Sequence, residues 1–411
     1  MNRILAAIAA VAFVEAGAAA LVHWLRGGCQ WLITPRDLAP KIDADGLRRF
    51  LDHGWDAELG WTRKPGTAHD EIDKKGKTCR YHIDATGARR NPGFEGHNPV
   101  VLIYGDSYAF ARQVNDHETW VHRLSKLMDV NAVNKGVGNY GLDQALLRLE
   151  MEFNDHPAPV VLMAVVPETI CRILGTWRHF SEYGNTFAFK PRFVLNGGKL
   201  SLVPNPMDAP EKFFRIPAIL PDLMASDEFY RRKFAPDMLR FPYLWHLWRS
   251  RRRNLPLMAA AFADRICGDR KRAFCRVMER NIDLTAAIYR EQAPVDLMVA
   301  IVERFAAFVR SRGAQPVFVV LPQLFDLKHL RAGDHYYAPL LERIADTLTV
   351  IDLGPFFADD DDDGVNYIDD RFGGHLSVEG NRRAAQRLAG TVATLLKNSE
   401  PAGRPSRNIR S

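Results

Sequence analysis

The chain has 411 residues, and 47% of them are hydrophobic, which is enough to bury one large core or two ordinary ones. The formal net charge of +6 is small for this length, and no arginine- or lysine-rich stretch with interleaved aromatic residues covers a whole domain. The composition therefore argues against a nucleic-acid-binding protein, and we expect no nucleic-acid partner.

Residues 1–26 predict a membrane anchor or signal segment. The run from Ile4 to Leu25 is apolar except for Glu15 and His23, and it is long enough to cross a bilayer. We favour an uncleaved anchor, because Leu21 to Leu25 continues the apolar run beyond the candidate cleavage sites. A cleaved signal peptide and a buried helix of a cytosolic protein are the alternatives.

An anchor places the rest of the chain outside the cytoplasm, on the periplasmic side in a Gram-negative cell, whereas cleavage makes the protein secreted. Five cysteines are compatible with that compartment. Cys267 and Cys275 are close enough in sequence to close a small disulfide loop, and five reduced thiols are the alternative. No group of cysteines and histidines has metal-ligand spacing, so we expect neither a metal site nor a cofactor.

After a lead-in segment at residues 27–95, which predicts loops with short strands, the main domain is expected at residues 96–400. It opens with the apolar run Val100–Tyr104, which predicts a buried strand and ends in Gly105-Asp106-Ser107. A serine at this place lies at the carboxyl edge of a parallel sheet, where open α/β folds bind ligands. Ser107 is therefore a candidate nucleophile, and a helix-capping serine is the alternative.

Further short apolar runs alternate with helical patterns. They predict strands at residues 131–134, 160–166, 317–322 and 348–352. Such alternation is typical of an α/β domain with a parallel sheet. Residues 401–411 are expected to form a disordered tail.

A long insertion interrupts this pattern at residues 174–290. Residues 190–203 predict a β-hairpin with Gly197 and Gly198 in its turn. Residues 210–290 predict basic helices, in which aromatic residues precede a cluster from Arg249 to Arg253 that only Ser250 interrupts. This composition suits contact with a membrane interface or an acidic glycan, and an amphipathic helix with solvated arginines is the alternative.

Three blocks in the chain resemble the SGNH/GDSL hydrolase superfamily: Gly105-Asp106-Ser107, the stretch 134–144, and Asp369-Asp370 followed by His375 ahead of the last helix. The resemblance covers residues 55 to 395 and points to a membrane-linked, extracytoplasmic subgroup with a long insertion. It implies a flavodoxin-like three-layer sandwich with a parallel sheet, together with an N-terminal apolar helix and a helical insertion.

The resemblance also implies a catalytic triad. Ser107 is the expected nucleophile and His375 the expected general base. Asp370 is expected to orient the imidazole, with Asp369 as the alternative. Both acids lie further from His375 than the acid of the family motif lies from its histidine. Gly373 and Gly374, which directly precede His375, allow the chain to turn back toward it.

The oxyanion donors implied by the resemblance are the backbone N–H groups of Ser107 and Asn139. The family's third block carries an asparagine whose side chain is a further donor, but this chain has Glu168-Thr169 there, so Thr169 becomes a candidate donor. Arg172 is expected either to pair with Glu168, as a solvent-facing ion pair, or to bind an anionic substrate.

These features predict an extracytoplasmic serine esterase, O-acyl transferase or deacetylase that acts on an ester of a glycan. The alternative is a catalytically weak protein of the same fold that binds or scaffolds a surface polysaccharide. The expected partners are an ester substrate, carried by a polysaccharide, and the cytoplasmic membrane through the N-terminal helix.

Overall fold

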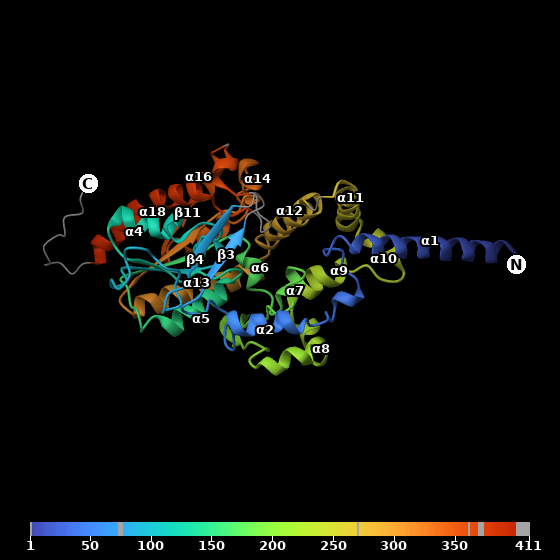
Figure 1. Ribbon diagram of the computed structural model, residues 1–411, viewed down its shortest axis with the longest axis horizontal. Helices are drawn as coiled ribbons and strands as arrows, with labels where there is room; N and C mark the ends of the chain where they lie inside the picture. Colours follow the sequence, from blue (N-terminus) through green and yellow to red (C-terminus); the bar gives the residue numbers. More distant parts are fainter. Residues whose placement is uncertain (1, 73–76, 269–270, 361, 369–373, 400–411) are drawn as a thin grey trace. The chain divides into compact units, whose positions relative to one another are not determined.

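The computed structural model describes residues 2–72, 77–268, 271–360, 362–368 and 374–399 (Figure 1). The chain divides into two compact units, each built from three stretches of sequence. Unit 1 comprises Met1–Phe50, Leu174–Lys190 and Pro206–Leu284. Unit 2 comprises Leu51–Ile173, Pro191–Asn205 and Thr285–Ser411.

Unit 2 contains a five-stranded sheet in which all neighbouring strands are parallel. The strands are β5 (Val101–Gly105), β6 (Ala132–Asn134), β7 (Val160–Val165), β10 (Gln315–Val320) and β11 (Thr349–Asp352). Their spatial order is β11-β10-β7-β5-β6, which is the strand order of flavodoxin-like folds. The predicted α/β fold with a parallel sheet is therefore confirmed.

Helices cover the sheet and make it the middle of three layers. α4 (Trp120–Met128) and α18 (Val378–Ser399) pack together on one face, and α5 (Leu142–Glu152) and α13 (Gln292–Ser311) pack together against the strands as well. Every residue of β5 and β7 is buried, which explains why these strands are continuous apolar runs in the sequence.

The remaining elements of unit 2 are short. They are β1 (Trp55–Asp56), β2 (Gly60–Trp61), β3 (Ala68–Ile72), β4 (Thr78–His82), α3 (Ser107–Phe110), η2 (Asp116–Glu118), α6 (Thr169–Arg172), β8 (Arg192–Asn196), β9 (Lys199–Val203), α14 (Asp326–Arg331), α15 (Ala338–Ile344), α16 (Gly354–Ala358) and α17 (Asp363–Asn366). β8 and β9 form the predicted hairpin, with Gly197 and Gly198 in its turn.

Unit 1 is helical in its described part. Its elements are α1 (Asn2–Arg26), η1 (Pro35–Asp37), α2 (Ala44–His53), α7 (Arg178–Ser181), η3 (Pro210–Arg215), α8 (Ile216–Ser226), η4 (Tyr230–Phe234), α9 (Ala235–Asp237), α10 (Tyr243–Arg249), α11 (Arg251–Cys267) and α12 (Lys271–Ile288). α2 stands where the sequence predicts loops and short strands. All five cysteines are reduced thiols, so Cys267 and Cys275 form no disulfide bond.

Candidate active site

Ser107 lies where strand β5 ends and helix α3 begins. Gly105 has a φ of +150°, and a Cβ atom there would lie 1.8 Å from the Ala164 carbonyl oxygen, so only glycine permits this close approach of the strands. Asp106 then caps α3, because its carboxylate accepts a hydrogen bond of 2.8 Å from the Tyr108 N–H. β5 lies between β6 and β7, so this turn presents the serine at the switch point of the sheet.

His375 lies directly beside this serine. Its Nε2 atom is 2.9 Å from Ser107 Oγ, although 268 residues separate the two positions. Ser107 is 6% exposed and His375 is 3% exposed. A serine hydroxyl within hydrogen-bond distance of an imidazole has the geometry of a nucleophile with its general base. The structure thus brings the two side chains together, and their catalytic roles stay predictions.

Tyr108 contacts His375 as well. Its ring stacks on the imidazole with the centroids 4.7 Å apart, and its hydroxyl donates a hydrogen bond of 2.6 Å to the Gly374 carbonyl. The Ile368 N–H also donates a hydrogen bond of 2.8 Å to the His375 carbonyl. These contacts position the imidazole. The sequence patterns assign no role to Tyr108, although its position directly after Ser107 could have indicated that it lies beside the site.

The acid of the predicted triad lies outside the described residues. Asp370 and the alternative Asp369 both fall within residues 369–373, which the structure does not describe. Their role as the carboxylate that orients His375 therefore stays a prediction.

Asp106 belongs to a buried network of charges. Its Oδ2 atom accepts a hydrogen bond of 2.9 Å from the Val166 N–H and lies 3.4 Å from Nη1 of Arg172. Arg172 also donates to Glu168 at 2.7 Å and to the Tyr140 carbonyl at 3.2 Å. Burial raises the pKa of the Asp106 carboxyl, and the positive charge of Arg172 and the backbone N–H donors oppose that rise.

This network bears on the two expectations for Arg172. The ion pair with Glu168 is present, but it is buried rather than solvent-facing, because Arg172 is 4% and Glu168 is 7% exposed. The guanidinium links the turn after β5 to helix α6. Binding of an anionic substrate by Arg172 stays a prediction.

The candidate oxyanion donors lie in different settings. The Ser107 N–H is at the first position of α3, where an N–H group has no carbonyl partner within the helix. Asn139 is half-buried and has a φ of 64°, the left-handed conformation that asparagine tolerates. Thr169 is fully buried, and its Oγ1 atom accepts a hydrogen bond of 3.0 Å from the Leu142 N–H at the start of α5. The oxyanion roles of all three stay predictions.

Gln323 is a candidate that the sequence patterns do not identify. It follows β10 at the carboxyl edge of the sheet and is 2% exposed. Its Nε2 atom has no hydrogen-bond partner among the residues that the structure describes. The adjacent Leu324 packs against Gly374, the residue before His375. A buried amide donor without a partner costs stability, so Gln323 is a candidate for contact with a ligand.

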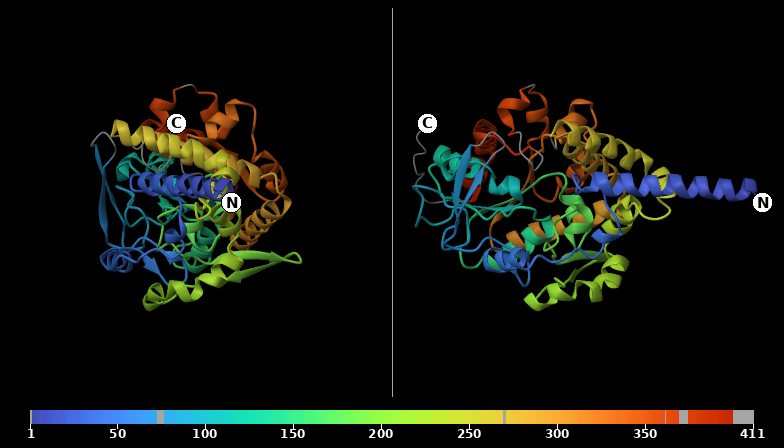
Figure 2. Two further views of the ribbon diagram at one scale, coloured as in Figure 1. Left: turned by 90° about the vertical axis from the view of Figure 1, so that its right-hand side faces the viewer. Right: turned by 45° about the vertical axis from the view of Figure 1, so that its right-hand side comes forward.

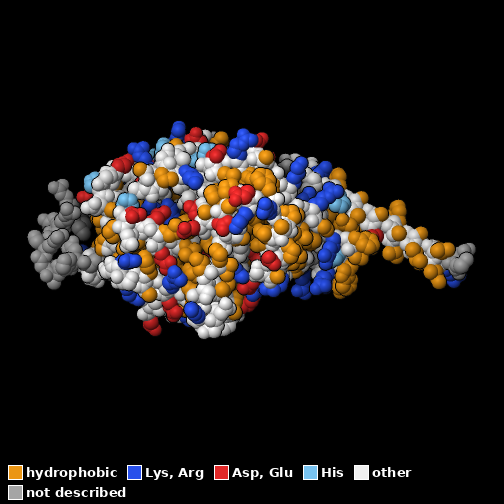
Figure 3. Space-filling model, turned by 90° about the horizontal axis from the view of Figure 1, so that it is seen from below, with side chains coloured by type: hydrophobic (Ala, Val, Ile, Leu, Met, Phe, Trp, Pro, Cys, Tyr) orange, Lys and Arg blue, Asp and Glu red, His pale blue; other side chains and the backbone are white. Residues whose placement is uncertain are grey.

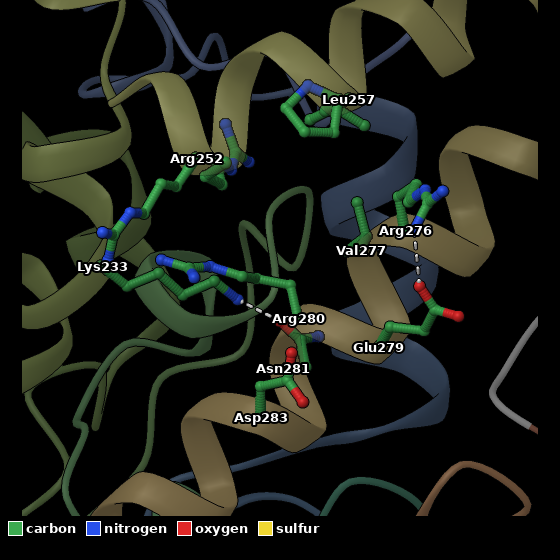
Figure 4. A pocket seen from close by; sticks show the side chains of 11 residues that line it. Lys233, Arg252, Leu257, Arg276, Val277, Glu279, Arg280, Asn281 and Asp283 are labelled. Atoms are coloured by element: carbon green, nitrogen blue, oxygen red, sulfur yellow. Dashed lines mark hydrogen bonds and ion pairs between the residues drawn. The ribbon is translucent and has the colours of Figure 1, made fainter. Parts of the chain in front are cut away.

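Unit 1 contains a separate cavity of about 180 Å³, and five of the eleven residues that line it are lysine or arginine (Figure 4). Lys233 lies in its wall and donates a hydrogen bond of 2.6 Å to Asn281. Arg253 also lines it, but this residue is 8% exposed and lies 3.3 Å from Asp237. The expectation that the whole cluster from Arg249 to Arg253 faces a partner or solvent is therefore wrong for Arg253.

Within the described ranges, no group of three or more His, Cys, Asp or Glu side chains is arranged to hold a metal ion.

Comparisons with known proteins add little to this geometry. No protein-family model matches the chain, and no curated protein matches it. A solved structure from Desulfitobacterium hafniense DCB-2, described as a G-D-S-L family protein of presumed lipolytic activity, aligns with 71% of this chain and 99% of its own at 10% sequence identity. Its TM-score is 0.30, so the argument for the fold rests on the strand order of this chain.

Proposed function

We propose that the protein is a serine hydrolase of the SGNH/GDSL type that cleaves or transfers an ester. The observation that carries this proposal is the 2.9 Å contact between Ser107 Oγ and His375 Nε2. The contact lies at the carboxyl edge of a flavodoxin-like sheet, next to its switch point, where such folds bind ligands. The three sequence blocks that resemble the superfamily support the same conclusion.

In the proposed reaction, His375 Nε2 accepts the hydroxyl proton while Ser107 Oγ attacks the carbonyl carbon of the ester. Negative charge develops on the carbonyl oxygen, and the N–H groups of Ser107 and Asn139 are the proposed donors to it. The imidazolium then gives its proton to the leaving alkoxide, and an acyl-serine forms. Water or a sugar hydroxyl, deprotonated by His375, accepts the acyl group and releases the serine.

We further propose that α1 anchors the protein in the cytoplasmic membrane and that the reaction takes place outside the cytoplasm. α1 is long and apolar enough to cross a membrane, which supports the anchor. An ester of a polysaccharide is the proposed substrate. Deacetylation and O-acyl transfer differ only in whether water or a sugar hydroxyl takes the acyl group.

A catalytically weak protein that binds a polysaccharide is the second candidate. It is favoured by Glu168-Thr169, which stand where the family carries an amide donor. The loss of one oxyanion donor typically lowers a rate by about 10²–10³-fold.

Labelling with a fluorophosphonate probe separates the two candidates. A hydrolase is expected to react covalently at Ser107, to lose the label in Ser107→Ala, and to keep it in the control Ser311→Ala, which removes an exposed serine. Hydrolysis of p-nitrophenyl acetate should follow the same pattern. A folded protein that takes up no label, and whose esterase rate is the same in Ser107→Ala, would support the binding protein instead.

A further inference from the structure

Helix α1 has two parts with different surroundings. Every residue from Arg3 to Val14 is exposed, and this part extends free of the rest of unit 1 with hydrophobic side chains along it (Figures 2 and 3). From Glu15 onward, one stripe of the helix is covered: Ala18 and Ala19 lie three and four residues after Glu15, and Val22 and Leu25 follow at steps of three. The helices that cover it are α10 and α11.

Glu15 forms the first link between α1 and α10. Its carboxylate accepts hydrogen bonds from the N–H groups of Tyr243 and Leu244, the latter at 3.0 Å. These are the first two residues of α10, and the residue before them, Pro242, offers no side-chain cap. The acid therefore satisfies donors that the helix leaves unpaired, and it lies at the positive end of the helix dipole.

From that point α10 runs along α1 toward Arg26. Leu247 packs in one apolar cluster with Val22 and Leu25 of α1. The Tyr243 hydroxyl also lies 3.1 Å from Nε2 of His23. The second part of α1 is thus packed against α10, which lies next to it in Figure 1.

The length of α1 determines how deep this pair of helices lies in a bilayer. The free part, from Arg3 to Val14, rises only about 18 Å at 1.5 Å per residue. The hydrocarbon core is about 30 Å thick, so a helix that crosses it needs about 20 apolar residues. The crossing therefore has to include the part of α1 beyond Glu15, which places this acid and the start of α10 within the hydrocarbon.

The outward side of α10 is suited to that environment. Phe241 is 75% exposed, Trp245 52% and Trp248 58%, and the two tryptophan rings stack with their centroids 5.3 Å apart. α10 rises about 10 Å along its seven residues, which brings its end to the level of the headgroups. The exposed Arg249, Arg251 and Arg252 follow there, as expected where basic side chains meet lipid phosphates.

We propose that α10, together with Phe241 and Pro242, is embedded in the same leaflet of the bilayer as the second part of α1. Its aromatic side contacts acyl chains, Arg249 and the neighbouring Arg251 and Arg252 contact headgroup phosphates, and its first N–H groups offset the buried charge of Glu15. This inference rests on the proposed membrane anchorage and extends it from one helix to a helix pair.

Fluorescence quenching by brominated lipids tests the embedding. The full-length protein is reconstituted in liposomes whose phospholipids carry bromine on the acyl chains, and it is compared with the double variant Trp245→Phe/Trp248→Phe. We expect the quenched part of the emission to fall in the double variant. The control Trp55→Phe, in unit 2, should leave that quenched part unchanged.

A second reporter separates the embedding of α10 from the anchorage itself. Phe13→Trp, placed in the double variant, reports on the free part of α1. If this tryptophan is quenched but Trp245 and Trp248 contribute nothing to the quenched emission, α1 is an anchor and the embedding of α10 is overturned. If Phe13→Trp is not quenched either, the anchorage and the embedding fail together.

Discussion

The ring of Tyr108 stacks on the imidazole of His375 with an interplanar angle of 30°, and its hydroxyl is bonded to the carbonyl of the residue before that histidine. Tyr108 directly follows Ser107. One short turn of helix therefore carries the candidate nucleophile and also the side chain that fixes the orientation and position of the imidazole of His375, the candidate base.

We expect Tyr108→Phe to lower kcat by about 5- to 10-fold with little change in KM, because it removes one hydrogen bond worth about 1 kcal/mol and keeps the stacked ring. Tyr108→Ala, which also removes the ring, should cost more. Steady-state hydrolysis of p-nitrophenyl acetate measures both parameters. An unchanged kcat in both variants would show that the tyrosine does not position His375.

Substitution of either member of the Ser107–His375 pair should nearly abolish turnover. We expect Ser107→Ala and His375→Asn each to lower kcat by at least about 10³-fold, because nucleophile and base act as a unit. The double variant should be hardly slower than either single variant. Additive losses in the double variant would contradict a direct proton transfer between the two groups.

Arg172→Leu should destabilise the protein by about 3–5 kcal/mol, because it leaves two buried carboxylates, Asp106 and Glu168, without their cation. Burial already raises the pKa of Asp106, and loss of the arginine raises it further. The destabilisation is therefore greatest when the carboxylates are charged, at pH 8, and becomes smaller as the pH falls and they take up protons.

Urea unfolding at pH 8 and at pH 5 measures this difference, and Arg172→Lys is the matched control that keeps the positive charge. An Arg172→Leu protein that keeps its stability but has a raised KM for an acidic ester would instead support the substrate-binding role.

Asp326 should make the stability of unit 2 depend on pH. Burial raises the pKa of its carboxyl from 3.8 to about 7. The folded state therefore favours the neutral acid, so its contribution to stability is complete below about pH 4 and is lost as the pH rises to about 7. At about 1.4 kcal/mol per unit, a shift of about three units corresponds to about 4 kcal/mol.

Asp326→Asn keeps a polar group beside the Tyr336 hydroxyl and the Gln323 N–H, which bond to the carboxylate. We expect the difference in unfolding free energy between this variant and the original protein to change between pH 4 and pH 7 and to be constant above pH 8. A difference that does not vary over this range would contradict the raised pKa.

Gln323→Met tests whether the unpartnered amide serves the substrate. Removal of a buried donor without a partner should leave the unfolding free energy equal or higher. If the amide contacts the substrate, we expect kcat/KM to fall by about 10-fold in the same variant. Unchanged activity would show that the Gln323 amide does not contact the substrate.

The strands of the sheet could be predicted from the sequence because each is a short apolar run that ends at a glycine, a proline or a polar residue. β5 and β7 are buried on both faces, and such runs stand out from their surroundings. The pairing of Ser107 with His375 was predicted from the superfamily resemblance, since 268 residues separate them and no local pattern connects them.

Other features depend on tertiary contacts that no local pattern indicates. Arg172 and Glu168 are four residues apart, a spacing that is typical of exposed ion pairs, and only the fold shows that they are buried. In the sequence, Glu15 is an isolated charge in an apolar helix. Its hydrogen-bond partners, the N–H groups of Tyr243 and Leu244, lie more than 220 residues later.

The interleaving of the two units has a consequence for the order in which the chain becomes functional as it is synthesised. The last stretch of unit 1 ends at Leu284, whereas the sheet still lacks β10, β11 and the segment that carries His375 at that point. Unit 1 is therefore complete before the sheet can close, because domains fold as their sequence emerges. Ser107 is synthesised 268 residues before His375, its proposed general base, so the proposed pair can form only after the segment that carries His375 has emerged.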